Sequence, residues 1–183
     1  MLRKIIFAIN TTINGSVDHT VGIADDELHN FYTDLLNSVD VVLMGRKTYQ
    51  LMESFWPVAH KDPGSTQSIL RFADKYNSIK KIVFSETLSE VKWQNSQLAD
   101  RNLQEIISKL KNQDGKNISA GSLSIALQLL KLNLIDEFWF AIHPVVVQKG
   151  PPLFEGIDII KKLKLVDSIT LSSCVIVHHY LNS

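Results

Sequence analysis

Residues 41–49 read Val-Val-Leu-Met-Gly-Arg-Lys-Thr-Tyr, and this stretch is the clearest indication of the fold class. Its first four residues form a continuous apolar run, which is typical of a strand buried on both faces of a sheet. Gly45 follows at once and lets the backbone approach a ligand where a helix begins. The first turn of that helix presents free amide groups and a positive dipole, which suit a phosphate, and Arg46 and Thr48 can supplement them. The stretch therefore predicts a strand, a glycine turn and a helix that together bind an anion.

Strand-like and helical patterns alternate along the rest of the chain. Continuous apolar runs predict further strands at residues 4–9, 81–84, 118–120 and 138–147, the last one broken by Pro144. Apolar residues recur at helical spacing in residues 25–39, 103–110 and 123–130. Residues 55–68 hold Pro57 and Pro63-Gly64 and predict a long surface loop, and residues 163–181 a closing antiparallel hairpin. The alternation predicts an α/β fold in one domain over residues 1–183: a three-layer α/β/α arrangement with a mainly parallel mixed sheet and an antiparallel C-terminal hairpin.

Composition excludes several classes of function. The chain holds 19 Lys and Arg residues against 19 Asp and Glu residues, so no net charge favours nucleic acid or an anionic membrane. No stretch approaches the roughly 18 apolar residues that span a bilayer, and no signal peptide is recognisable, which predicts a cytoplasmic protein. Cys174 is the single cysteine, and its apolar neighbours predict a buried, inert thiol. No cluster of His, Cys and carboxylate residues suggests a metal.

Two more strands end in turns built from small residues. Ser85-Glu86-Thr87 follows the apolar run at residues 81–84, and residues 119–122 read Ser-Ala-Gly-Ser before the next helix. Open parallel sheets bind ligands outside the carboxyl ends of their strands, so these turns and the Gly45 turn can converge on one elongated anion. Each turn alone can also be a tight strand-to-helix connection with no ligand.

An ordered set of motifs carries a family resemblance. Asn14-Gly15 comes first, then Met-Gly-Arg-Lys-Thr-Tyr at residues 44–49 and Val-Phe-Ser-Glu-Thr-Leu at residues 83–88. In this order they resemble the dihydrofolate-reductase-like superfamily. Leu-Ile-Asp-Glu at residues 134–137, together with residues 120–122 and 144–154, is similar to the branch of the riboflavin-biosynthesis reductase domain and its stand-alone bacterial relatives. The resemblance covers nearly the whole chain.

The resemblance implies an eight-stranded sheet, NADPH as hydride donor and a homodimer. It implies that cofactor phosphates are held by Gly45, Arg46, Lys47 and Thr48, the adenosine side by Phe84, Ser85 and Thr87, and the pyrophosphate by Gly121, Ser122 and Leu123. Asn14 and Gly15 are implied to belong to the mobile loop near the nicotinamide. Gly121→Val is then expected to abolish cofactor binding while the fold stays largely intact.

The expected activity is hydride transfer from NADPH to a C=N or C=O group of a small heterocyclic or sugar-derived substrate, as in a 5-amino-6-(5-phosphoribosylamino)uracil reductase. Glu27 or a bound water supplies the proton, although Glu27 also fits a solvated helix start beside Asp25 and Asp26. Folate reductases carry an arginine before the third strand, whereas residues 77–81 read Asn-Ser-Ile-Lys-Lys. A true dihydrofolate reductase is the first alternative, and a dinucleotide-binding sensor or dimerisation module without turnover is the second.

Overall fold

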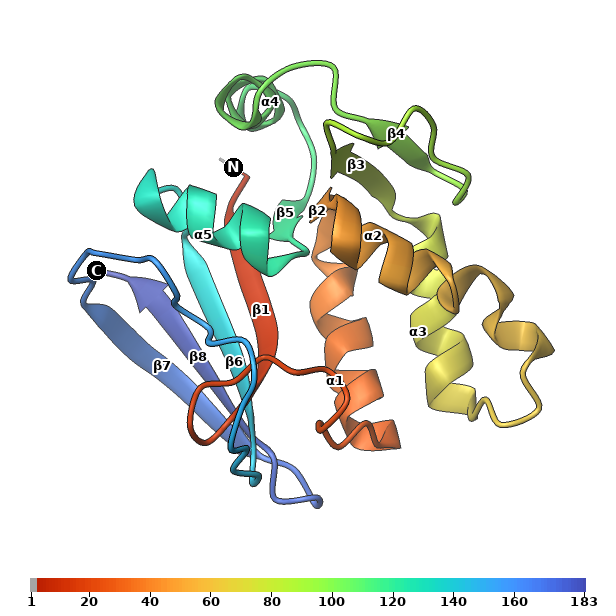
Figure 1. Cartoon of the computed structure of the whole chain (residues 1–183), viewed down its shortest axis with the longest axis vertical. Helices are drawn as coiled ribbons and strands as arrows, with labels where there is room; N and C mark the ends of the chain where they lie inside the picture. The colour runs from red at the N-terminus through yellow and green to blue at the C-terminus, as the bar shows by residue number, and fades with distance from the viewer. Residues whose placement is uncertain (1–2) are drawn as a thin grey trace.

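The computed structural model describes residues 3–183, and its strands form one eight-stranded sheet (Figure 1). The strands are β1 (Ile5–Thr12), β2 (Val39–Gly45), β3 (Lys80–Phe84), β4 (Ser96–Leu98), β5 (Asn117–Ala120), β6 (Glu137–His143), β7 (Leu163–Thr170) and β8 (Ile176–Asn182). Their spatial order is β4-β3-β2-β5-β1-β6-β8-β7. Strand β8 runs antiparallel to β6 and β7, and the other neighbouring pairs are parallel. The predicted mixed sheet with an antiparallel C-terminal hairpin is confirmed.

Helices cover both faces of this sheet. They are α1 (Asp26–Asn37), α2 (Arg46–Glu53), α3 (Gln67–Ser78), α4 (Leu103–Lys111) and α5 (Leu123–Lys131), with a 3-10 helix η1 at Trp56–Lys61. No helix formed by residues 3–183 is long and apolar enough to cross a membrane.

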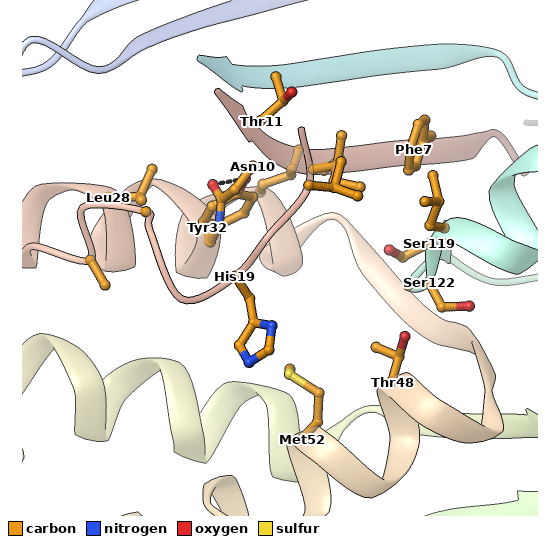
Figure 2. Close-up of a pocket in the computed structure, with 18 of the residues that line it drawn as sticks. Phe7, Asn10, Thr11, His19, Leu28, Tyr32, Thr48, Met52, Ser119 and Ser122 are labelled. Carbon is orange, nitrogen blue, oxygen red and sulfur yellow. Dashed lines mark hydrogen bonds between the residues drawn. The ribbon is translucent and has the colours of Figure 1, made fainter. Parts of the chain in front are cut away.

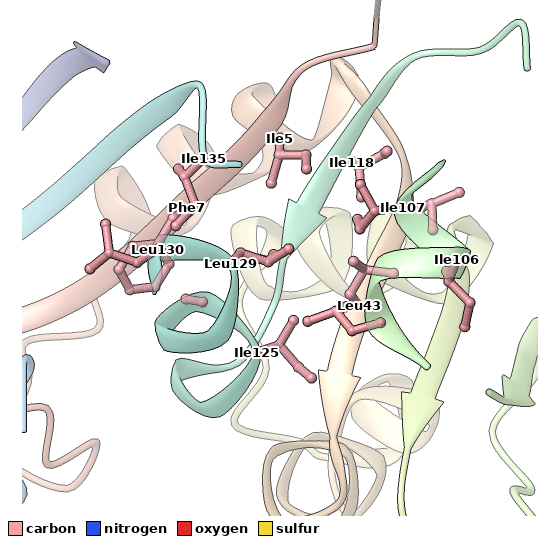
Figure 3. Close-up of a cluster of buried hydrophobic side chains, with 14 of the residues drawn as sticks. Ile5, Phe7, Leu43, Ile106, Ile107, Ile118, Ile125, Leu129, Leu130 and Ile135 are labelled. Atoms are coloured by element: carbon pink, nitrogen blue, oxygen red, sulfur yellow. The ribbon is translucent and has the colours of Figure 1, made fainter. Parts of the chain in front are cut away.

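The central strands are buried on both sides because alternate residues point to opposite helical layers. Leu43 and Ile118 pack with α4 and α5, through residues such as Ile106, Ile125 and Leu129 (Figure 3). The neighbouring residues Val42 and Met44 point the other way, into a cluster with side chains of α1, α2 and α3. This arrangement is the predicted three-layer α/β/α sandwich.

Three local predictions are wrong. Residues 55–68 are not one open loop, because they contain η1, whose Ala59 is buried, and end where α3 begins. Strand β6 ends at His143, one residue before Pro144, and does not continue to residue 147. Cys174 is exposed in the turn between β7 and β8 at a φ of 63°, so its apolar neighbours do not bury it.

Candidate functional site

A cavity of about 450 Å³ lies at the carboxyl ends of β1 and β5, within the size range of small-molecule sites (Figure 2). Its walls come from the second half of β1, the turn from β5 into α5, and the inward faces of α1 and α2. The loop between β1 and α1 crosses over it and contributes Val17, Asp18, His19 and Ile23. The position agrees with the rule that open parallel sheets bind ligands beyond the carboxyl ends of their strands.

One end of the cavity is polar and is built by two helix starts. Gly45 precedes α2 and Ser122 precedes α5, and neither residue makes a side-chain cap to its own helix. The Ser122 hydroxyl instead accepts a hydrogen bond from the Gly45 amide at 2.9 Å. Since β2 and β5 are neighbouring parallel strands, the two helices begin side by side, each with first-turn amides that no cap satisfies. Thr48 and Ser122 both line the cavity at this end (Figure 2).

The structure brings some of the predicted cofactor residues to the cavity and leaves others beside it. Thr48, Gly121, Ser122 and Leu123 line it, and Gly45, Arg46 and Lys47 belong to the same helix start as Thr48. Phe84 pairs in register with Gly45, which puts the 84–87 turn next to that helix start. In this turn the Ser85 hydroxyl already accepts hydrogen bonds from the Thr87 and Leu88 amides, at 3.1 and 2.9 Å.

Asn14 and Gly15 lie away from the main cavity. The Asn14 side chain donates to the Val147 carbonyl at 2.8 Å and accepts from the Val147 amide at 3.2 Å. Gly15 has a φ of +78°, a backbone conformation that favours glycine, and it lines a second, shallower hollow beside Phe154. Both residues therefore shape the turn after β1 and do not line the cavity that contains Thr48 and Ser122.

Glu27 points away from the cavity. Its exposed carboxylate accepts hydrogen bonds from the Ser172 amide and hydroxyl, at 2.7 and 2.6 Å, and these bonds lower the pKa of Glu27. The α1 residues that face the cavity include Leu28 and Tyr32, one helical turn apart. Glu27 is thus not placed to give a proton to a substrate in this cavity, and the geometry fits the solvated helix start.

The opposite end of the cavity is apolar and aromatic. Leu28, Met52, Trp56 and Phe72 form its walls, and the Trp56 and Phe72 ring centroids lie 4.5 Å apart. The Tyr32 hydroxyl donates to Asn10 Oδ1 at 2.8 Å, and burial raises the pKa of Tyr32. That hydroxyl therefore stays neutral at physiological pH.

His143 anchors the loop that crosses the cavity. Its side chain is buried and lines the cavity, and Nδ1 accepts a hydrogen bond from the Ile23 amide at 3.0 Å. The proton of the neutral ring is then on Nε2, which has no hydrogen-bond partner among residues 3–183. Burial lowers the pKa of His143. The hydrogen bond holds the loop in place in front of β6.

Sequence reasoning did not assign the residues Asn10, Asp18 and His19 to the site. Figure 2 shows the His19 ring reaching from the loop toward Met52, across the open side of the cavity. The signal available for Asn10 is its position as a polar residue near the end of the first buried strand. The loop residues offer no comparable signal, because their positions depend on the contact between Ile23 and His143, 120 residues apart.

Gly121 is required by packing. A Cβ atom on Gly121 would lie 2.3 Å from Val42 Cγ1 and 3.3 Å from the Leu43 carbonyl oxygen, both on neighbouring β2. The Gly121 amide also donates to that carbonyl at 2.9 Å. The expectation that Gly121→Val leaves the fold intact is therefore wrong, because the added side chain meets the core before it meets any ligand.

Comparison with known proteins agrees with this fold. A family model described as RibD C-terminal domain matches residues 3–177. The "Uncharacterized protein YyaP" of Bacillus subtilis (strain 168) is 35% identical over 186 residues, covering 97% of this chain and 95% of that protein. A putative riboflavin biosynthesis protein from Shewanella sp. PV-4 has a TM-score of 0.74 at 20% identity, with 99% of both chains covered.

The fold is also similar to that of a solved dihydrofolate reductase. Dihydrofolate reductase from Enterococcus faecalis, solved in complex with NADP(H), has a TM-score of 0.66 at 10% identity, covering 98% of this chain and 96% of that one. The resemblance to dihydrofolate-reductase-like proteins is confirmed at the level of fold. Because the family model spans almost the whole chain and YyaP is 35% identical, the chain belongs to the RibD C-terminal domain family.

Proposed function

We propose that this protein is an NADPH-dependent reductase that acts on a C=N or C=O group of a small heterocyclic or sugar-derived substrate. One observation carries the proposal: two helices without side-chain caps begin side by side at Gly45 and Ser122, and Thr48, Ser122 and Leu123 of these helix starts line a cavity with an apolar far end. The paired helix starts are suited to an extended phosphate group, and the apolar end of the cavity is suited to a ring. Family membership supports the same assignment.

The residues present fit a dinucleotide. A side chain at Gly45 would approach Ser124 Oγ to 2.5 Å, so glycine at this position keeps the two helix starts close together. Arg46 and Lys47 add positive charge at the start of α2, and Thr48 and Ser122 add hydroxyl groups. The cofactor, when bound, supplies a hydride, and the reduced group takes up one proton.

Of the two proton sources expected from the sequence, Glu27 and a bound water, we propose the water. Glu27 is turned away, and the carboxylate of Asp18 accepts hydrogen bonds from the Thr20 hydroxyl and amide, at 2.7 and 2.9 Å. Those bonds lower the pKa of Asp18, so its carboxylate is ionised at neutral pH and holds no proton to give. The task of the chain is then to position the two reactants and to limit the access of bulk water.

Dihydrofolate fits this cavity less well. The cavity-facing residue at the start of α1 is Leu28, where a carboxylate would be needed to pair with a pterin ring. We expect a kcat/KM for dihydrofolate below ~10⁴ M⁻¹s⁻¹, the lower end of the usual range for enzymes with their own substrates. Steady-state oxidation of NADPH measures it, and a higher value favours the folate alternative.

Cofactor binding is tested separately from turnover, by calorimetric titration of NADPH into the full chain. Lys47→Glu reverses a charge at the start of α2 and is expected to weaken binding about tenfold or more. Lys131→Glu reverses a charge at the far end of α5 and is the matched control. Equal affinities for the two variants would contradict the assigned phosphate site. Binding without oxidation of NADPH by any tested C=N or C=O compound would favour the sensor alternative.

A further inference from the structure

The cavity has a polar part and an apolar part, which we treat as two compartments. The helix starts at Gly45 and Ser122 define the cofactor end, and Leu28, Tyr32, Met52, Trp56 and Phe72 define what we call the substrate compartment. Thr48 and Met52 lie one turn apart on α2, and the Trp56 indole N–H points to Met52 Sδ at 3.1 Å, so the wall continues from one compartment to the other. Leu28 and Phe72 are buried, and the Trp56 ring packs against Phe72. These walls match the flat faces of an aromatic or heterocyclic ring.

The cavity lining contains few groups that carry a permanent charge. Among the described side chains that line it there is no lysine or arginine, the one carboxylate is Asp18, and the histidines are His19, His29 and His143. The hydrogen bonds of Asp18 with Thr20 favour its ionised form, so the loop over the cavity carries a carboxylate. A phosphate in the substrate compartment would face this carboxylate and would find no lysine or arginine, the residues that bind phosphate groups most strongly.

The polar side chains that reach the compartment, Asn10 and His29, can form hydrogen bonds with a ligand. The Asn10 side-chain oxygen accepts a hydrogen bond from the Tyr32 hydroxyl, and the Asn10 amide N–H groups can donate to a ligand. His29 Nδ1 lies 2.8 Å from the Asp25 carbonyl oxygen, which can only accept, so Nδ1 donates and Nε2 of the neutral ring is an acceptor. Such groups orient a neutral heterocycle, but they do not balance a charge.

We propose that the substrate compartment takes an uncharged, planar and largely apolar ring compound and discriminates against its phosphorylated counterpart. This inference rests on the reductase function proposed above and narrows its substrate class, since it removes phosphorylated sugar derivatives from the candidates. Charged ligand groups, such as the phosphates of the cofactor, then bind only at the cofactor end.

A matched pair of probes tests the inference without any turnover. The probes are 1-naphthol and 1-naphthyl phosphate, which share a planar ring system and differ by the phosphate. Each is titrated into the full chain by calorimetry, first alone and then with NADP⁺ present. We expect 1-naphthol to bind at least about tenfold more tightly than 1-naphthyl phosphate. Equal or tighter binding of the phosphate overturns the inference, and so does a failure of 1-naphthol to bind at millimolar concentration.

Two exposed leucines supply a charge variant and its control. Leu51 lines the cavity and is 47% exposed, whereas Leu132 is 38% exposed just beyond α5 and does not line it. Leu51→Arg places a cation at the cavity wall and is expected to shrink the preference for 1-naphthol severalfold, while Leu132→Arg leaves it unchanged. An unchanged preference in both variants contradicts the electrostatic explanation.

The two proposals fail in distinguishable ways. If 1-naphthol is preferred but no compound supports NADPH oxidation, the substrate compartment is as described and the reductase function is wrong. If NADPH oxidation is supported by phosphorylated substrates as well as by their unphosphorylated counterparts, the reductase function holds and the substrate class is wrong.

Discussion

Gly121 is required for packing against β2, although its position in the sequence suggested a role in cofactor binding. Gly121→Val puts a branched side chain against Val42 Cγ1, which is 2.3 Å from the new Cβ position. We expect a loss of about 1–3 kcal/mol in the free energy of unfolding, as for other overpacked cores, measured by urea denaturation. Gly64→Val is the control, because a Cβ there has only ordinary contacts with Asp62. Loss of NADPH binding with an unchanged unfolding midpoint would contradict this account.

Lys81 is a buried cation with an unusual set of partners. Its side chain is fully buried, Nζ lies 4.4 Å from the Trp93 ring centroid, and it donates to the carbonyls of Asn77, Ile79 and Gln94. Burial lowers the pKa of Lys81 to about 8. A lysine in the unfolded chain keeps its proton to a pH of about 10.4.

The stability contribution of Lys81 should therefore depend on pH. Between about pH 8 and pH 10 the unfolded state binds the proton and the folded state does not, so stability rises with pH in this window. We expect the free energy of unfolding of the wild type, minus that of Lys81→Met, to rise by about 2 kcal/mol from pH 8 to pH 10. Subtracting the variant cancels the other titrating groups. A difference that stays flat across the window would show that Lys81 titrates normally.

At the scale of elements, the buried strands and the strand-to-helix turns could be predicted, and one contact of α3 could not. The runs at β1, β2 and β3 are apolar on both faces, which is a local property of the sequence. Helix α3 buries Phe72, Ala73 and Tyr76, which recur at helical spacing in the sequence. It also buries the polar residue Asn77, whose side chain accepts from the Trp93 indole at 2.6 Å. That partner is 16 residues away, so the burial of Asn77 follows from tertiary packing and not from the local pattern.

Some features of the candidate site could likewise be predicted from the sequence, and others could not. The turns at Gly45 and Gly121 follow strands that the sequence shows, and their convergence follows from the parallel order of the sheet. The direction of Glu27 and the course of the loop over the cavity depend on hydrogen bonds to Ser172 and His143, far along the chain. Neither bond has a local sequence pattern, so the proton-donor position and the loop residues could not be derived in advance.

We expect the preference for one dinucleotide over the other to be set where β2 and β3 end. Gly45 pairs with Phe84, so Arg46 and the Ser85–Thr87 turn start from adjacent positions. Arg46 suits a 2′-phosphate, and Glu86, which is exposed in the turn, opposes it. We expect NADPH to bind about tenfold more tightly than NADH, a difference of about 1.4 kcal/mol. Glu86→Arg should widen the preference, and Arg46→Ala should remove most of it.

Dissociation constants for both cofactors, measured by calorimetry, check this expectation. Glu90→Arg is the matched control for Glu86→Arg, since it makes the same charge change at an exposed residue beyond the turn. Tighter binding of NADH by the unmodified protein would contradict the prediction, as would an equal effect of the two arginine variants.

At the scale of the whole molecule, the two edges of the sheet differ. Strand β4, at one edge, has three residues, whereas β7, at the other, has eight residues, of which seven are exposed. Unpaired strand edges offer a row of free N–H and C=O groups to another chain. Leu165, Val166 and Ile169 on β7 add exposed apolar side chains to this edge. A long, partly apolar edge is the feature expected of a strand that pairs with a second copy.

We therefore predict a homodimer in which β7 of each copy forms the contact. Light scattering coupled to size exclusion should give twice the chain mass, and Val166→Lys should shift the protein to the monomer, because a charge on the edge opposes pairing. Val146→Lys is the control, since Val146 is exposed in the segment after β6 and lies outside β7. Because β7 contributes no residue to the cavity, the monomeric variant should still bind NADPH with unchanged affinity. A wild-type monomer at every concentration tested, or an equal effect of both lysine variants, would show that β7 is a free edge and not an interface.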